Sequence, residues 1–339
     1  MRPQAPSMAP PGGFFLCDVL DAIPKGDMAT MEHPVFSLST RPDLRILSYA
    51  HNGAEITVTP SVKGLATIHD KDILIYCVSQ LMAAINAGRA VGRTLHLRAA
   101  DLMAAVGRET SGDGYRRLRE AFERLAGTRI TTNIATGDTE TTTGFGLIDS
   151  WEIVRRTPPG QKGGGRMVSV AVTISEWLFR AVCAKSVLTL SRDYFTLRKP
   201  LERRIYELAR KHCGRQPAWR ISVEVAHRKS GSASPRRVFR KMLRDMAEAD
   251  ALPDYHLEME DEADVLRVRP RDHLLEEAPQ AAPRPTPEAL EAARALMPGH
   301  DVHALEAEWR GVWAATGRRR LRSADAAFLG WLRKRRANG

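Results

Sequence analysis

Apolar and polar positions follow two different periods along residues 46–126. Two β-rich runs meet at Asn52-Gly53, a dipeptide typical of a tight β-hairpin turn. From about Asp70 to Ala87 the apolar residues recur every three or four positions, which predicts a helix with a buried face. The run TLHL then predicts a strand, and further helices are expected at about 99–106 and 115–126.

Two β segments, RITTNI and GFGLIDSWEIV, follow the third helix and predict a hairpin. Helix, strand, helix, turn, helix and hairpin is the order of a winged helix, which is a helix-turn-helix extended by a β ribbon. The glycine-rich stretch from Pro158 to Arg166 is expected to be a flexible loop.

The same pattern recurs 124 positions later without a gap. The matched positions are Leu81 with Ile205, Ile85 with Ala209, Leu95 with Trp219, Leu97 with Ile221, Gly107 with Gly231, Tyr115 with Phe239, Leu118 with Met242 and Phe122 with Met246. In the second copy, SPRRVFRKMLRDMAEA takes the place of the recognition helix, and YHLEMEDEADVLRVRP takes that of the wing. Because element order, apolar positions and a glycine turn stay in one register, we predict an α+β chain with two tandem winged-helix domains.

The predicted organisation has five parts. They are a loosely ordered N-terminal arm (1–32), a first winged-helix domain (33–190), a second winged-helix domain (191–275), a linker (276–287) and a small helical C-terminal module (288–339). The arm is rich in Pro, Gly and Met, and the linker EEAPQAAPRPTP has the composition of a spacer. The last module should use Trp309, Trp313, Phe328, Leu329 and Trp331 as its core, with stacking on single-stranded nucleic acid as the alternative use of the tryptophans.

Composition narrows the possible partners. Fifty-one Lys and Arg against forty Asp and Glu give a formal net charge of +11, which points to nucleic acid or an anionic membrane surface. The longest apolar window, Ile73 to Ile85, is too short to span a bilayer, and the start of the chain has no usable signal sequence. We therefore expect a cytoplasmic protein without a membrane partner. Its four cysteines form no CxxC pair, so we expect free thiols, no metal and no cofactor.

The segment from Ser234 to Met246 is a strongly amphipathic helix candidate. Its basic and apolar residues fall on nearly opposite faces at helical spacing, with Ser234 as the expected N-cap and Pro235 in the first turn. Only Asp245 interrupts the basic run, so we expect the cationic face to be free of internal partners and completed by duplex DNA. A solvated surface helix is the alternative.

The matching helix of the first copy differs in charge. Arg116, Arg117, Arg119 and Arg124 share their face with glutamates, and Arg116/Glu120 and Glu120/Arg124 have the spacing of ion pairs. A polyanion would have to compete with these carboxylates. We therefore predict that the second helix is the main DNA reader, and that the first contributes backbone and protein–protein contacts.

Recognition helices present their N-terminal turns to base edges and their basic flanks to phosphates. The candidate DNA-binding residues are accordingly Ser232, Ser234, Arg236, Arg237, Arg240, Lys241, Arg244, Arg228, Lys229, Arg116, Arg117 and Arg119. His227 is expected to pack or to face solvent. The acidic run MEDEAD falls in the second wing, where a solvated loop is favoured over a metal site. The basic GRRRLRS and LRKRR near the end of the chain are either a solvated face or a nucleic-acid contact.

Enzymatic signatures are missing. The sequence has no His-x-His, which a nicking initiator would need for its metal, and no GxxxxGK[ST] for a nucleotide phosphate. No Ser/His/Asp set or pair of catalytic carboxylates stands out. We therefore expect a binding protein and not an enzyme.

Together with the tandem order, MEHPVFSLSTRPD and HDKDILIYCVSQLM resemble the plasmid replication initiator protein A family, whose architecture is similar to that of iteron-plasmid Rep initiators. The resemblance covers about residues 14–272. It implies binding to origin repeats, opening of the adjacent duplex, recruitment of the host initiator ATPase and replicative helicase, and dimers that repress the initiator's own promoter. A winged-helix transcription repressor and a helicase-loading scaffold that binds single strands are the alternatives.

Overall fold

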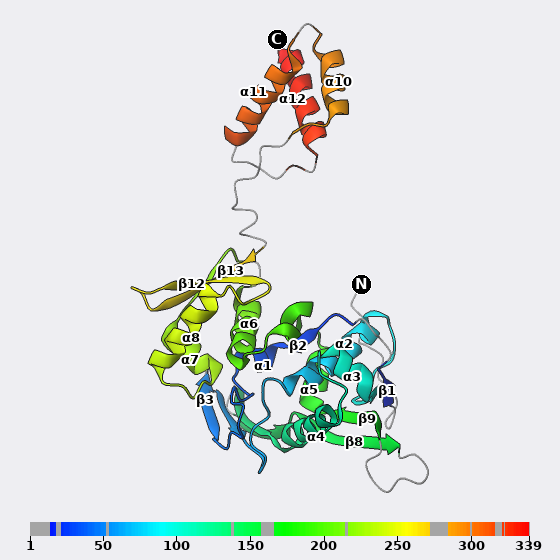
Figure 1. Ribbon diagram of the computed structural model, residues 1–339, viewed down its shortest axis with the longest axis vertical. Coiled ribbons are helices and arrows are strands. Elements are labelled where there is room, and N and C mark those ends of the chain that lie inside the picture. Colours follow the sequence, from blue (N-terminus) through cyan, green and yellow to red (C-terminus); the bar gives the residue numbers. More distant parts are fainter. Residues whose placement is uncertain are drawn as a thin grey trace. The chain divides into compact units, whose positions relative to one another are not determined.

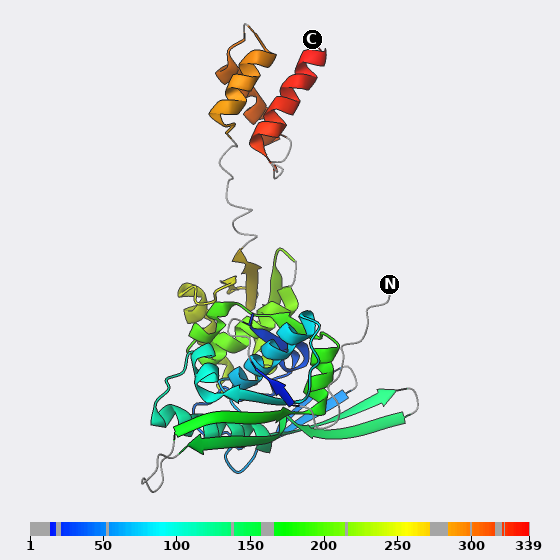
Figure 2. The same ribbon diagram turned by 90° about the vertical axis from the view of Figure 1, so that its right-hand side faces the viewer.

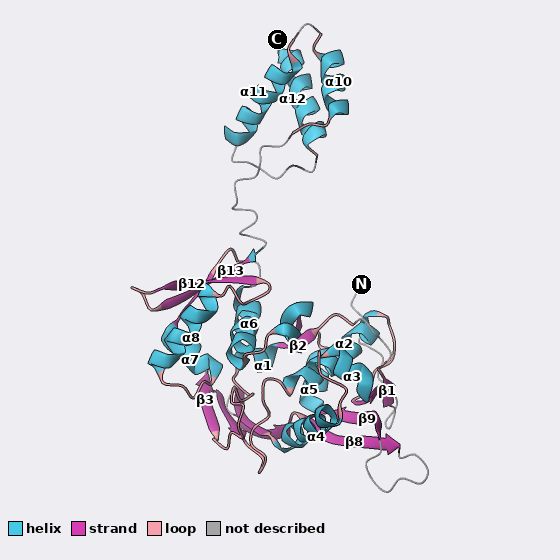
Figure 3. Ribbon diagram, in the orientation of Figure 1, coloured by secondary structure: helices cyan, strands magenta, loops and turns pink. Residues whose placement is uncertain are grey.

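The structure is a computed structural model that describes residues 14–17, 22–51, 54–136, 139–156, 166–213, 216–271, 284–298, 300–315, 321 and 323–338. The chain divides into two compact units, Met1–Arg271 and Asp272–Gly339. The first unit mixes helices and sheets, and the described part of the second is helical (Figure 3). The chain is therefore α+β, as predicted.

The first unit contains two groups of elements. The first group comprises β1 (Phe14–Leu16), β2 (Lys25–Asp27), α1 (Met28–Glu32), β3 (Leu47–His51), β4 (Ala54–Thr59), α2 (Lys71–Asn86), β5 (Thr94–Arg98), α3 (Ala99–Ala105), α4 (Gly112–Gly127), β6 (Arg129–Thr136), β7 (Thr139–Gly146), β8 (Ile148–Arg156), β9 (Arg166–Ile174) and α5 (Glu176–Cys183). The second group comprises β10 (Val187–Thr189), the 3-10 helix η1 (Arg192–Thr196), α6 (Pro200–Cys213), β11 (Trp219–Ser222), α7 (Val223–Ser230), α8 (Arg236–Glu248), β12 (Tyr255–Glu260) and β13 (Val265–Pro270).

The same arrangement of elements occurs twice in this unit (Figure 1). In the first copy α2, β5, α3 and α4 are followed by β8 and β9, and the strands lie in the order β5-β9-β8, with β1 beside β5. In the second copy α6, β11, α7 and α8 are followed by β12 and β13, and the order is β11-β13-β12. Gly107 and Gly231 end the matching helices with φ of 64° and 69°. The repeat predicted from the sequence is present in element order, sheet order and turn geometry.

The hairpin predicted for the first copy is only partly correct: RITTNI does pair with GFG, the end of β7, but IDSWEIV lies in β8 and in another sheet. RITTNI lies in β6, which pairs with β7 and joins β3 and β4 in a separate four-stranded sheet that Figure 2 shows reaching outward. The strands that return to β5 are β8 and β9, and β9 was not predicted from the sequence. Of the glycine-rich segment, expected as a flexible loop from Pro158 to Arg166, residues 158–165 lie outside the described residues and Arg166 begins β9. Burial of Val170, Val172 and Ile174 holds β9 in the sheet.

Part of the predicted N-terminal arm is well packed, so the expectation of a loosely ordered segment is wrong for its described residues. β1 runs parallel to β5, and β2 pairs with β10. Asp27 caps α1 by accepting a hydrogen bond from the Thr30 N–H (2.8 Å), and Met31 is fully buried. The composition of the arm could not reveal these partners, because they lie far away along the chain.

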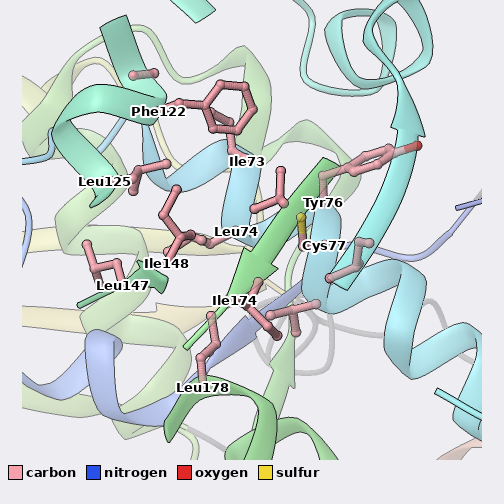
Figure 4. Packing of buried hydrophobic residues seen from close by; sticks show 14 of the residues in the cluster. Ile73, Leu74, Tyr76, Cys77, Phe122, Leu125, Leu147, Ile148, Ile174 and Leu178 are labelled. Atoms are coloured by element: carbon pink, nitrogen blue, oxygen red, sulfur yellow. The ribbon is translucent and has the colours of Figure 1, made fainter. Parts of the chain in front are cut away.

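Two hydrophobic clusters fill the first unit, and α2 contributes to both. Figure 4 shows the first cluster, in which Ile73 and Leu74 of α2 pack with Phe122 of α4 and with buried residues of β8 and β9. The second cluster is centred on α6, α7, α8 and the β11-β13-β12 sheet. Ile75 of α2 belongs to this second cluster. Helix α2 is therefore buried on more than one side.

Buried ion pairs connect α2 with α6 at the boundary between the clusters. Lys71 Nζ lies 2.8 Å from Glu207 Oε1, and Arg203 pairs with Asp72. The four side chains are between 1% and 4% exposed. Removing one partner of such a pair would leave an uncompensated charge in a low-dielectric interior.

His69, which lies just before α2, makes the unit sensitive to acid. Burial lowers the pKa of His69 to about 4, and the nearby charges of Arg203 and Arg108 act in the same direction. In the unfolded chain the ring binds a proton near pH 6.5, whereas the folded protein does so only near pH 4. Its contribution to the free energy of unfolding is therefore complete above pH 6.5 and is lost as the pH falls toward 4.

We expect this loss to reach at most about 3 kcal/mol, from about 1.4 kcal/mol for each pKa unit. Urea unfolding of the wild type and of His69→Gln at pH 7 and pH 4.5 isolates the effect, since other groups titrate equally in both proteins. The wild type should lose more stability between the two pH values than the variant. Equal losses would contradict the assignment to His69.

The second unit is a small helical module. Its elements are α10 (Pro287–Leu296), α11 (Val302–Ala315) and α12 (Ala324–Asn338). Trp309, Trp313 and Phe328 are buried as predicted, whereas Leu329 and Trp331 are only partly buried at the edge of the cluster. No helix in the described parts of either unit is long and apolar enough to cross a membrane.

Candidate nucleic-acid interface

The helix pair α7 and α8 carries most of the predicted DNA-binding residues. Ser222 caps α7, where its Oγ accepts a hydrogen bond from the Val225 N–H (3.3 Å). The helix ends at Gly231, whose φ lies in the left-handed region that favours glycine. A Cβ at this position would also lie 2.8 Å from the Cβ of Pro34. Turn geometry and close packing against residues before β3 therefore both require glycine here.

The start of α8 differs from the prediction. Ser234 does not cap the helix, and Pro235, with extended backbone geometry (φ −55°, ψ 144°), is itself the N-cap. The Ser234 N–H donates to Ser232 Oγ (3.2 Å), and its carbonyl oxygen lies 2.7 Å from His227 Nε2. The His227 ring packs edge-on against Phe239, with the ring centroids 4.9 Å apart. This confirms the expectation that the histidine has a packing role.

The apolar face of α8 is narrower than expected. Phe239, Leu243 and Met246 are at most 3% exposed, whereas Val238 and Met242 are 40% and 38% exposed. Helix α8 packs against α7 and β12. The buried stripe fixes the rotation of the helix and leaves its basic side chains on the surface.

The cationic face of α8 is not free of internal partners, which corrects the main expectation from the sequence. The ion pairs are Arg240 with Asp264, Arg244 with Asp261, Lys241 with Asp245 and Arg236 with Glu224. Two of the carboxylates belong to the acidic turn 261–264 between β12 and β13, which the sheet brings against α8. The four basic side chains remain 31% to 71% exposed, so these are surface pairs that a phosphate can displace at low cost.

Two predicted residues keep an unpaired charge. Arg237 at the start of α8 and Arg228 in the last turn of α7 are exposed, and neither has a carboxylate partner among the described residues. Lys229 is different, because its ammonium group is hydrogen-bonded to Glu32 of α1. Burial alone would raise the pKa of Glu32, but hydrogen bonds from Lys229 and Lys211 lower it to about 2. Lys229 is therefore held by the fold and is less available than predicted.

The arginines of α4 are paired within the protein, as the charge pattern indicated. Arg116 pairs with Glu120 (2.9 Å) and also with Asp113. Arg117 pairs with the same Asp113 (2.6 Å), and Arg119 lies 3.5 Å from Glu123.

Arg124 departs from the expected pairing with Glu120. It binds Asp70, the N-cap residue of α2, through two hydrogen bonds of 2.7 and 2.8 Å. Helix α4 packs on the first cluster and α8 on the second, so the candidates on the two helices rest on different parts of the core.

Two hollows of about 600 and 680 Å³ flank the turn between α7 and α8. Ser232 and Arg45 line both of them, and Arg228 lines the second. Ser232 and Ser234 are half-buried here, so they shape the turn more than they project from it. In the part of the chain that the structure describes, no cluster of three or more His, Cys, Asp or Glu could hold a metal ion.

Sequence reasoning missed the role of Glu224, Asp261 and Asp264 as partners of the cationic face. The sequence does hold a signal, because the acidic run MEDEAD is predicted to lie in the second wing, and the wing turn follows the strand beside α8. The order of the three-stranded sheet, β11-β13-β12, is what carries that turn to the flank of α8, and the local sequence does not reveal it.

Known proteins resemble this chain over most of its length. The family described as Replication initiator protein A matches residues 25–257. A protein of Wigglesworthia glossinidia brevipalpis described as "Putative replication protein" is 37% identical over 247 residues, which cover 72% of this chain and 88% of that protein. A crystal structure of domains 2 and 3 of RctB matches with a TM-score of 0.53 and 14% identity, covering 70% of this chain and 94% of the other. The last likeness supports the mixed α+β fold.

Proposed function

The chain belongs to the replication initiator protein A family, and on that premise we propose that it starts the replication of a plasmid by binding repeated sequences at the origin. Family membership supports the role in replication initiation. The surface of α7 and α8, with exposed Arg228 and Arg237 and an overall charge of +11, supports duplex DNA as the partner.

We assign each structural repeat as a winged helix. The support is the shared order of helices and strands and the placement of a helix, α4 or α8, before the returning hairpin. In the second repeat α8 is the recognition helix, since exposed Arg237 has no carboxylate partner in the described residues and Arg228 of the preceding helix α7 has none either. Helix α4, whose arginines are paired, contributes backbone and protein–protein contacts.

Arg240 and Lys241 should affect DNA binding in different ways. Arg240→Ala is expected to reduce the preference for the bound sequence by about 5- to 150-fold, the range for loss of a bidentate contact to guanine. Lys241→Ala should weaken selected and random duplexes alike, because a lysine on phosphate carries no sequence information. Fluorescence anisotropy at one fixed salt concentration, with a duplex selected from a random pool and a scrambled duplex, measures both. Equal effects of the two variants on the two duplexes would show that α8 presents another face to DNA.

The wider role follows from the family and is open to direct tests. We propose that the bound protein opens the adjacent duplex and recruits the host initiator ATPase and replicative helicase in the cytoplasm, without catalysing a reaction itself. We also propose that dimers repress its own promoter.

Footprinting on the DNA beside the gene should reveal several direct repeats, whereas one inverted repeat would favour a transcription repressor. Tighter binding to single strands than to duplex would favour a helicase-loading scaffold. Maintenance of an origin-less vector that carries this DNA tests initiation.

A further inference from the structure

One arginine of α8 is held in a fixed orientation by the turn between β12 and β13. Arg240 donates from Nε to Asp264 Oδ1 (2.6 Å) and from Nη2 to Asp264 Oδ2 (2.7 Å). The carboxylate therefore grips one edge of the guanidinium group through two parallel hydrogen bonds. Arg240 Nη1 has no hydrogen-bond partner within the described residues, and the side chain is 31% exposed.

Asp264 is itself firmly placed. Its φ of 51° lies in the left-handed region, which Asp and Asn tolerate better than most residues. Its carbonyl oxygen accepts a hydrogen bond from the Val223 N–H at the start of α7 (2.9 Å), and its N–H donates to the Asp261 carbonyl oxygen (3.3 Å). The next residue, Val265, pairs with Ser222 of β11. The carboxylate is thus aimed at α8 by a turn that is tied to both α7 and the sheet.

The free edge of Arg240 has the geometry to recognise a base. When a carboxylate binds the Nε–Nη2 edge of an arginine, the Nη1–Nη2 edge at the end of the side chain still presents two parallel N–H donors. This fork matches the N7 and O6 acceptors of guanine in the major groove. Because the side chain is already ordered, it loses less conformational freedom when it binds.

We propose that Asp264 is a positioning residue that pre-orients Arg240 for bidentate recognition of guanine. This inference rests on the proposed function of α8 as a recognition helix. Asp264 would not touch DNA in this role, and it acts only through the guanidinium group that it holds.

A second pair on the same helix provides a matched control. Arg244 donates from Nη2 to Asp261 Oδ1 (2.7 Å), which is its one hydrogen bond to a carboxylate within the described residues. The Asp261 side chain is 61% exposed. A single bond to an exposed group does not fix the orientation of the fork. Removal of the Asp261 charge should therefore change the affinity for all DNA without changing the sequence that is read.

The test compares base preference among full-length variants. Duplexes are selected from a random pool by the wild type, and each guanine of the selected sequence is replaced in turn. Arg240→Ala identifies the guanine that depends on Arg240. Asp264→Asn keeps the backbone geometry but loses the second acceptor, and Asp264→Gly removes the side chain at a φ that glycine favours. Both should reduce discrimination at that one guanine by about 5-fold or more while affinity for random duplex stays equal or rises. Asp261→Asn should leave discrimination unchanged.

Other results separate the possible failures. Unchanged discrimination in both Asp264 variants would overturn the positioning role, and so would a uniform gain in affinity for every duplex, which indicates simple loss of repulsion. A wild type with no sequence preference would refute the proposed function as well. Preference that depends on Arg240 but not on Asp264 would refute only this inference. Thermal melting of each variant verifies that a loss of discrimination does not come from unfolding.

Discussion

Arg204→Ala is expected to lower the free energy of unfolding by about 3 to 5 kcal/mol, the range for breaking a buried charged network. Arg204 lies in α6, and its side chain is only 3% exposed. Its guanidinium donates to the three consecutive carbonyl oxygens at the end of α1 (residues 30–32) at 3.0 to 3.2 Å. It also donates twice to the Lys229 carbonyl oxygen of α7, at 2.6 and 3.1 Å.

The physical reason is that the ends of two helices converge on one cation. The carbonyl groups at a helix C-terminus have no partner within the helix and carry its negative partial charge. Arg204 satisfies these groups in both α1 and α7, and Glu207 lies 3.4 Å from it as a counter-charge. Alanine would leave several buried carbonyl oxygens without their partner. It would also remove one of the cations beside Glu207, which keeps its pair with Lys71.

Urea unfolding measures the loss, and Arg220→Ala is the matched control. Arg220 also pairs with a carboxylate, Glu260, but its side chain is 59% exposed, so its removal should change the free energy of unfolding by less than about 1 kcal/mol. A decrease below about 1 kcal/mol for Arg204→Ala would contradict the assignment of a buried network. Arg204→Met separates charge from volume, and it should be nearly as damaging, because the carbonyl groups stay unpaired.

Arg204 also illustrates what the sequence could and could not predict. The repeat predicts a helix over FTLRKPLERRIYELARKHC, and the structure confirms its main part as α6, which begins at Pro200. Nothing local distinguishes Arg204 from a surface arginine, because the carbonyl groups that it binds at the end of α1 lie more than 170 positions earlier in the chain. Local signals such as Asn52-Gly53 and the turn at Gly107 predicted the β3–β4 pairing and the end of α3 correctly.

The candidate site shows the same difference between local contacts, which the sequence predicted, and long-range contacts, which it did not. Side chains four positions apart on one helix, such as Arg116 and Glu120, were paired correctly from spacing alone. The pairs that cross from α8 to the β12–β13 turn were not, because they depend on how the sheet folds back beside the helix. The prediction of a cationic face without internal partners therefore holds only for Arg228 and Arg237 among the described candidates of α7 and α8. The other basic side chains of α8 have ion pairs on the surface, and a DNA phosphate can replace the carboxylate in these pairs.

This narrower premise leads to a second large effect. Replacing Arg228 and Arg237 together with glutamate is expected to weaken duplex DNA binding by about 100-fold near physiological salt. Both side chains are exposed and lack a carboxylate partner in the described part of the protein, so phosphate contact displaces only water and counterions. Each reversal removes one contact and adds one repulsion.

The double variant Arg117→Glu with Arg119→Glu on α4 is the control, since it changes the net charge by the same amount. Those side chains are 71% and 49% exposed and pair with Asp113 and Glu123. Because α4 is not the proposed recognition helix, we expect a loss below about 5-fold. Binding to one duplex over a range of salt concentrations gives a further criterion. The plot of log affinity against log salt has a negative slope, and its magnitude should decrease by about 1.8 for the α7–α8 variant, because each phosphate contact that is lost removes about 0.9.

The comparison distinguishes a local contact from the field of the whole protein. If duplex binding depended on net charge alone, both double variants would lose affinity equally. The magnitude of the slope of log affinity against log salt would also decrease by the same amount in both. That result would remove α7 and α8 from the interface. A large loss with the α7–α8 variant and a small one with the α4 variant requires phosphate to lie beside the start of α8, where Arg237 and the fork of Arg240 can reach the same groove.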